Sequence, residues 1–141
     1  MCTLGDIIIV IEFKNELGQK IKKHSFVVIN DKNGKIEGMN YDFISNMICS
    51  FHDIEHKKRK LSFKENLELN HEKVISNNAN DKDGFIKVDQ LYYFDKSKID
   101  YYIFGKIIPE FLNELSQLLL MLTKEGKVKK VKTNIEDYAS S

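Results

Sequence analysis

Short apolar runs separated by polar stretches set the pattern of this chain from its start. Residues 7–11 form a β-branched run of strand length that Phe13 closes, and residues 24–30 repeat this character. Because the segment between the runs is polar and contains Gly18, we expect two buried strands that pair antiparallel. The stretch from Asp31 to Gly34 predicts a turn after them, since its Asn-Gly pair readily adopts positive φ.

The middle of the chain predicts more of the same sheet. Residues 41–51 fit either a strand or a short helix, and we interpret their second half as a strand. A strongly polar block covers residues 52–60, apolar positions within 61–69 indicate another strand, and residues 76–83 have the composition of an exposed loop. Further short strands are expected at residues 85–88, 92–94 and 101–104, which are rich in aromatic and β-branched side chains.

One amphipathic helix is predicted after Pro109, which suits a first helical turn. Apolar side chains then recur at three- and four-residue steps and Gly126 ends the pattern. The stripe comprises Phe111, Leu112, Leu115, Leu118, Leu119 and Leu122. Leu120 and Met121 widen the apolar arc, so the helix either caps the core alone or also forms a dimer contact. Residues 125–141 are expected to form a basic and polar tail that is solvated or disordered.

These elements indicate a single domain over residues 1–124 that is mainly β, in the α+β class, with a small, strongly bent antiparallel sheet and a terminal helix. The chain has 141 residues and a net charge of +1, so its overall charge does not argue for a polyanionic partner. Cys2 and Cys49 are expected to be free thiols in a reducing cytoplasm. The apolar run near the start is too short to span a bilayer, so no membrane segment is expected.

Several of these segments, taken in order, resemble the MazF/PemK family over roughly residues 5–123, with an insertion-like basic block at 52–60. The resemblance rests on Gly5-Asp6-Ile7, the basic stretch before residues 25–30, Ile48 to Ser50, Lys87 to Gln90, Asp95 to Lys98 and the final helix. It implies an SH3-like β-barrel with a C-terminal helix. Members are dimeric toxins of toxin–antitoxin pairs that cut single-stranded RNA without metal or cofactor. The resemblance therefore implies three partners, namely single-stranded RNA, a cognate antitoxin and a second copy of the chain.

The resemblance assigns candidate catalytic roles position by position. The family's Arg-Pro pair, whose arginine contacts the scissile phosphate, aligns with His24 and Ser25, so this chain departs from the motif there. The Thr-Ser pair that closes the third strand aligns with Cys49 and Ser50, and the hydroxyl role can pass only to Ser50. Lys87 and Asp89 match a basic and an acidic residue around the Asp-Gln turn.

The chemistry of RNA cleavage independently favours the same residue types. Attack by the 2′-hydroxyl needs a base, an acid for the leaving 5′-oxygen, and positive charge near the phosphorane. His24 could act as acid or base, because its reference pKa lies near neutrality. Lys87 could hold the phosphate, Asp89 could act as base or orient a partner, and Ser50 could donate a hydrogen bond. No metal is required for these roles.

Each candidate also has a structural interpretation. His24 fits an ordinary exposed strand start, Lys87 and Asp89 fit a solvated face, and Ser50 fits a turn cap. Cys49 fits a small buried apolar residue better than a reactive nucleophile. The histidines and acids of residues 52–56 share a helical face but do not match a known zinc spacing, so we expect no metal.

Basic clusters flank the candidate site along the sequence, and they are either solvated loops or an RNA-binding groove. If the fold brings them together, aromatic side chains could stack on unpaired bases. The candidate RNA-binding residues are Lys22, Lys23, Lys57, Lys58, Arg59, Lys60, Gln90 and Tyr92.

Two other functions use the same barrel. A CcdB-like protein would poison DNA gyrase through residues at the helix end without cutting nucleic acid, and a supercoiling assay separates this from RNA cleavage. A catalytically silent nucleic-acid-binding module is the third alternative, motivated by the missing Arg-Pro pair.

Overall fold

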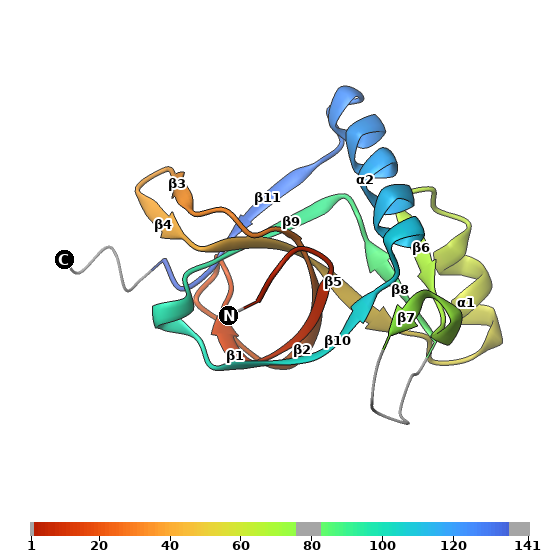
Figure 1. Cartoon of the computed structure of the whole chain (residues 1–141), viewed down its shortest axis with the longest axis horizontal. Helices are drawn as coiled ribbons and strands as arrows, with labels where there is room; N and C mark the ends of the chain where they lie inside the picture. The colour runs from red at the N-terminus through yellow and green to blue at the C-terminus, as the bar shows by residue number, and fades with distance from the viewer. Residues whose placement is uncertain (1, 76–82, 136–141) are drawn as a thin grey trace.

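The computed structural model describes residues 2–75 and 83–135 (Figure 1). Strands dominate it, as the sequence predicts, and a long helix follows them near the C-terminus. The strands are β1 (Asp6–Lys14), β2 (Lys20–Asn30), β3 (Gly34–Ile36), β4 (Met39–Tyr41), β5 (Phe43–Ser50), β6 (Asn66–Leu69), β7 (Val74–Ile75), β8 (Gly84–Lys87), β9 (Gln90–Phe94), β10 (Tyr101–Ile107) and β11 (Lys129–Lys132). The helices are α1 (Ile54–Leu61) and α2 (Pro109–Lys124), with single 3-10 turns at His71–Lys73 and Lys96–Lys98.

The main sheet curls into a nearly closed antiparallel barrel with α2 outside it (Figure 1). Its strand order is β11-β9-β5-β2-β1-β10-β7, and β8 joins β5 to β6 at one side. β1 and β2 pair antiparallel, as expected from their apolar runs. The prediction of a mainly β, SH3-like barrel with a C-terminal helix is therefore confirmed.

β5 has two different partners along one edge, which creates a fork in the sheet. Its first residues, Phe43 to Ser45, pair with β9. Its last residues, Ile48 to Ser50, pair with β8. The chain passes from β8 to β9 through a turn at Val88 and Asp89 that lies opposite the middle of β5. The Asp-Gln pair of the sequence therefore lies where two strands part.

Alternate residues of the central strands face two hydrophobic layers. Ile8 and Val10 of β1 and Phe26 of β2 point into the barrel, where they pack with aromatic rings. Ile7 and Val27 face the other way. This second layer is closed by Phe111, Leu115 and Leu122 of α2, all of which are buried.

The predicted boundaries of α2 are confirmed. Pro109 occupies its first turn, and Gly126 follows its end with a φ of 69°, which glycine adopts without strain. Leu120 and Met121 remain 56% and 42% exposed in the single chain, so the alternative of a dimer contact stays open. Neither helix of the described residues is long and apolar enough to cross a membrane.

The predicted turn at residues 31–34 is wrong. Gly34 begins β3, which pairs with β4 in a separate hairpin, and the positive φ values of 47° and 85° lie at Glu37 and Gly38. Instead of forming a turn, Gly34 pairs with Tyr41 of β4. A glycine suits this position because a Cβ there would strike the tyrosine ring. The loop expected at 76–83 lies almost entirely outside the described residues.

The expectation of a solvated or disordered C-terminal tail is also wrong for residues 129–135. β11 runs parallel to β9, from Lys129 beside Gln90 to Lys132 beside Tyr93. Val131 and Thr133 are buried, and the Thr133 hydroxyl donates to the carbonyl oxygen of Tyr93 at 2.7 Å. Three of the four residues of β11 are lysines, so the sequence did not indicate a strand, although Val131 faces inward.

Val131→Asp is therefore expected to lower the free energy of unfolding by roughly 2–4 kcal/mol, because it buries a carboxylate that lacks a partner. Lys130→Asp at the exposed neighbouring position is expected to change it by less than about 0.5 kcal/mol. Urea denaturation followed by circular dichroism measures both values. Equal, negligible effects at the two positions would show that β11 does not form.

Candidate functional site

Two of the four predicted catalytic residues line one small pocket, which we call the turn pocket. Its volume is about 180 Å³. It is lined by Lys60, Phe63, Glu65, Asn66, Lys87, Asp89 and Gln90. Lys87, Asp89 and Gln90 were predicted from the Asp-Gln segment, and Lys60 from the basic block. The fold therefore brings an insertion-like block next to the segment with the strongest family resemblance.

Backbone contacts hold the parts of the turn pocket together. Lys87 ends β8 and pairs with Asn66 of β6. The side-chain amide of Asn66 donates to the carbonyl oxygen of Lys60 at 2.9 Å and so ties the end of α1 to the sheet. The backbone N–H of Val88 donates to the carbonyl oxygen of Glu65 at 3.0 Å. These contacts fix where the two lysines stand relative to Asp89.

The local structure also explains why a polar block forms α1. The side chain of Asp53 accepts a hydrogen bond from the backbone N–H of His56, which caps the N-terminus of the helix. Three basic residues, Lys58, Arg59 and Lys60, lie in the last turn, where they favour the helix dipole.

Electrostatics in the turn pocket favour a proton-accepting carboxyl group. Burial raises the pKa of Asp89 and the nearby Glu65 carboxylate raises it further, while a backbone hydrogen bond and the charge of Lys87 oppose these effects only in part. A carboxyl group with a raised pKa is a stronger base once it is deprotonated. The pocket thus combines a base with ammonium groups that can face an anion.

His24 is not among the residues that line this pocket, but it belongs to a nearby strand on the same face. It lies opposite Val10, which points into the barrel, so His24 sits on the barrel side of β2. Its Nδ1 is 2.9 Å from the carbonyl oxygen of Lys22. When Nδ1 carries the proton and donates this bond, Nε2 is left as an acceptor.

Cys49 connects His24 with Lys87 across the sheet. Extending the register of Ser25 and Ile48 by one residue sets His24 beside Cys49. Cys49 in turn pairs with Phe85, two residues before Lys87 on the same face of β8. Burial raises the pKa of the Cys49 thiol, while the charge of Lys87 lowers it. Both cysteines are free thiols, as expected.

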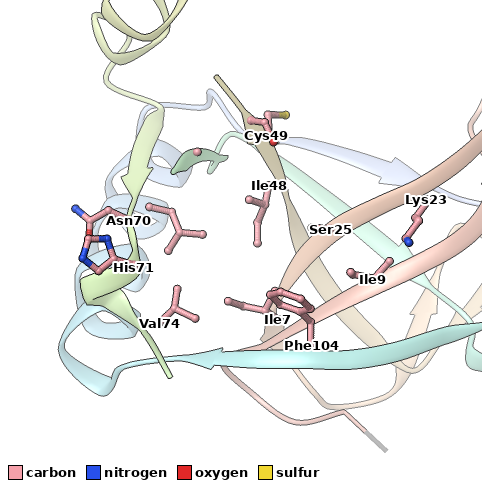
Figure 2. Close-up of a pocket in the computed structure, with 13 residues that line it drawn as sticks. Ile7, Ile9, Lys23, Ser25, Ile48, Cys49, Asn70, His71, Val74 and Phe104 are labelled. Atoms are coloured by element: carbon pink, nitrogen blue, oxygen red, sulfur yellow. The ribbon is translucent and has the colours of Figure 1, made fainter. Parts of the chain in front are cut away.

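Ser50 lies on the opposite face and belongs to a different pocket. This outer pocket has a volume of about 380 Å³ and is lined by Ser50 together with Lys23, Ser25 and Ile48, among others. Figure 2 shows Ile48 pointing into it, with Lys23 at one side and His71 and Asn70 at the other. The structure therefore separates Ser50 from Lys87 and Asp89.

The remaining lysine and arginine candidates for RNA binding lie on two different elements, β2 and α1. Lys22 is exposed on β2, and Lys23 lines the outer pocket with an uncommon φ of 23°. On α1, Lys58 and Arg59 are exposed, whereas Lys57 pairs with Glu68 at 3.1 Å.

Tyr92 is engaged inside the barrel rather than displayed for stacking. Its ring packs edge-on against Phe13 and Phe26, with centroids 6.1 and 5.2 Å away. Its hydroxyl donates to the Oε1 atom of Gln90 at 3.3 Å. Tyr92 therefore supports a residue of the turn pocket, and its placement does not favour stacking on a base.

His52, just before α1, and His56, within it, lie close together. The rings of His52 and His56 have centroids 4.4 Å apart, and the backbone N–H of His52 donates to Nδ1 of His56. Within residues 2–75 and 83–135, no group of three or more histidine, cysteine, aspartate or glutamate side chains is placed to hold a metal ion.

Comparison of the chain with models of known protein families, with curated proteins and with solved structures finds no match.

Proposed function

We propose that this protein is a MazF/PemK-like toxin that cleaves single-stranded RNA by 2′-hydroxyl attack, without a metal ion. The observation that supports it is the turn pocket, where Lys60 and Lys87 share a small cavity with Asp89, whose pKa is raised. The barrel with its terminal helix is the fold that the resemblance implies.

The roles follow from charge and placement. Lys60 and Lys87 bind the scissile phosphate and stabilise the negative charge that gathers on the phosphorane. Asp89 takes the proton from the 2′-hydroxyl group. His24, on the same face of the sheet, protonates the leaving 5′-oxygen when its imidazole is charged. Ser50 has no role in this proposal, because it faces the outer pocket.

Binding of the RNA chain is assigned to α1. Lys58 and Arg59 are exposed in its last turn, next to Lys60 of the turn pocket, so a phosphate backbone can continue from the pocket along the helix. A cognate antitoxin and a second copy of the chain complete the proposal as partners.

The double variant Lys58→Gln, Arg59→Gln is expected to bind single-stranded RNA more weakly at low salt. Each lost phosphate contact should reduce the slope of log K against log salt concentration by about 0.7, because fewer counterions are released. Fluorescence anisotropy with a labelled oligonucleotide at several salt concentrations measures this slope. Lys35→Gln, at an exposed lysine on the β3–β4 hairpin, is the matched control and should leave the slope unchanged.

The function is tested by incubating purified protein with single-stranded RNA in the presence of a chelator. We expect fragments that end in 2′,3′-cyclic phosphate or 3′-phosphate, because the 2′-hydroxyl is the nucleophile. Intact RNA at high protein concentration would contradict the proposal. Inhibition of gyrase in a supercoiling assay would then favour the CcdB-like alternative, and RNA binding without either activity would favour a silent binding module.

A further inference from the structure

We propose that Asn46 is the positioning residue of the turn pocket, a buried amide that holds the β8–β9 turn in the conformation that presents Lys87 and Asp89. The catalytic part of this inference rests on the proposed function. The structural part concerns the turn alone and can be tested without RNA.

The fork in the sheet explains why an amide is needed at this position. Because β8 and β9 part opposite the middle of β5, β5 forms no ladder pairs with the turn itself, and carbonyl groups that face β5 there need another donor. Asn46 lies at this point and points its Nδ2 atom at them. Nδ2 is 2.8 Å from the carbonyl oxygen of Gln90, 3.3 Å from that of Lys87 and 3.5 Å from that of Val88. One side chain thus spans the whole turn.

The orientation of this amide is dictated by its surroundings. Three carbonyl oxygens accept from Nδ2, so a flipped amide would place Oδ1 against them and repel all three. Asn46 is fully buried, and its Oδ1 has no hydrogen-bond partner within the described part of the chain. A buried polar atom left unpaired is unfavourable, which indicates that the bonds to the turn are what keeps an asparagine at this place.

Two backbone contacts hold the same turn from other sides. The N–H of Val88 donates to Glu65, and the N–H of Lys129 in β11 donates to the carbonyl oxygen of Asp89 at 2.8 Å. Asn46 holds the turn through its side chain, so a substitution at this residue can remove its hydrogen bonds, whereas the two backbone contacts are not made by a side chain. Without it, Asp89 should keep its charge but lose its fixed direction toward the pocket.

The first test uses the unaltered protein. By NMR, the side-chain amide protons of Asn46 are expected to exchange with solvent at least about tenfold more slowly than those of the exposed Asn113, because bonded and buried protons are protected. Equal exchange rates at the two amides would overturn the proposal, whether or not the protein cleaves RNA.

The second test uses Asn46→Leu, which keeps the approximate volume and removes the donors. Exchange of the Val88 and Lys129 backbone amides is expected to rise by about tenfold or more, while amides within the β1–β2 pair stay protected. Ser45→Ala is the matched control on the same strand, since Ser45 is equally buried and its hydroxyl oxygen has no partner among the described residues. It should alter neither set of amides.

Where the unaltered protein cleaves RNA, Asn46→Leu is expected to lower kcat by about tenfold or more with little change in KM, and to move the acid limb of the pH–rate profile. Loss of kcat with an unchanged profile would indicate general destabilisation and overturn the positioning role. If the unaltered protein does not cleave RNA, the proposed function fails, and the exchange rates still decide the structural part. A variant that does not fold leaves the decision to the first test.

Discussion

Asp89→Asn is expected to reduce RNA cleavage by about 10²–10⁴-fold, the range typical for removing a general base. The substitution keeps the shape of the side chain and removes its basicity. Because Asp89 lies in the turn pocket with Lys60 and Lys87, RNA binding should change much less than kcat. Single-turnover cleavage at saturating protein concentration measures the chemical step directly.

The pH dependence of cleavage provides a second test of Asp89 as the base. A base acts in its deprotonated form, so activity falls as pH decreases through the pKa of Asp89. Burial and the Glu65 carboxylate raise that pKa, so the acid limb should lie above the ordinary range for aspartate. Glu65→Gln removes one of the two causes and should shift the limb toward lower pH.

Asp100→Asn is the matched control, because Asp100 is an exposed aspartate outside the turn pocket. It should leave both the rate and the pH profile unchanged. Full activity in Asp89→Asn, or an equal loss in the two variants, would remove Asp89 from the mechanism.

Phe94→Ala is expected to cause the largest loss of stability, about 3–5 kcal/mol in the free energy of unfolding. Phe94 is fully buried in the barrel, and its ring centroid lies 5.4 Å from that of Phe13, 5.0 Å from Phe26 and 5.5 Å from Phe43. Truncation removes these contacts and leaves a cavity that the nearly closed wall of strands resists filling.

The same substitution at Phe63, which is 48% exposed, provides the control and should lower stability by less than about 1 kcal/mol. Urea denaturation with a common m-value yields both figures. A loss in Phe94→Ala no larger than that in Phe63→Ala would mean that the barrel interior is not packed as described.

Apolar runs were sufficient to predict a strongly bent antiparallel sheet with a terminal helix, whereas the barrel itself was expected from the resemblance. Residues 7–11 contain no alternation with polar residues, and the structure explains this in part, because Ile8 and Val10 face the aromatic layer inside while Ile7 faces the α2 layer outside. The helix was equally readable, since Pro109 and Gly126 mark its ends in the sequence. These features depend on local composition, which a sequence displays directly.

β11 and the β3–β4 hairpin were not predicted from the sequence. β11 is made mostly of lysines and becomes a strand because β9 offers it an edge, and the β3–β4 hairpin displaced a turn that its Asn-Gly pair favoured. Pairing with a remote edge overrides local propensity in β11, whereas the hairpin is a local pairing of residues 34–36 with 39–41. The polar block became α1 through its cap at Asp53, a signal that was present but overlooked.

Individual residues of the candidate site were predicted from the sequence, but their arrangement in space was not. Lys87, Asp89 and Gln90 are neighbours in sequence and share a pocket, whereas the approach of Lys60 depends on how α1 is tied to β6. Ser50 does not share the turn pocket, because successive side chains of a strand point to opposite faces and Ser50 directly follows Cys49 in β5. Asn46 was missed because a single asparagine within an apolar strand carries no motif.

The pairing of β1 with β10 has a kinetic consequence. Asp6 lies opposite Lys106, so this pairing joins segments that are far apart in the chain. Closing such a long loop costs conformational entropy before the stabilising contacts between the strands can form. Refolding is therefore expected in the millisecond-to-second range of non-local β proteins, more slowly than in helical bundles. Before that closure, the edges of β1 and β10 are open to other chains, and aggregation should compete with refolding most strongly at this stage.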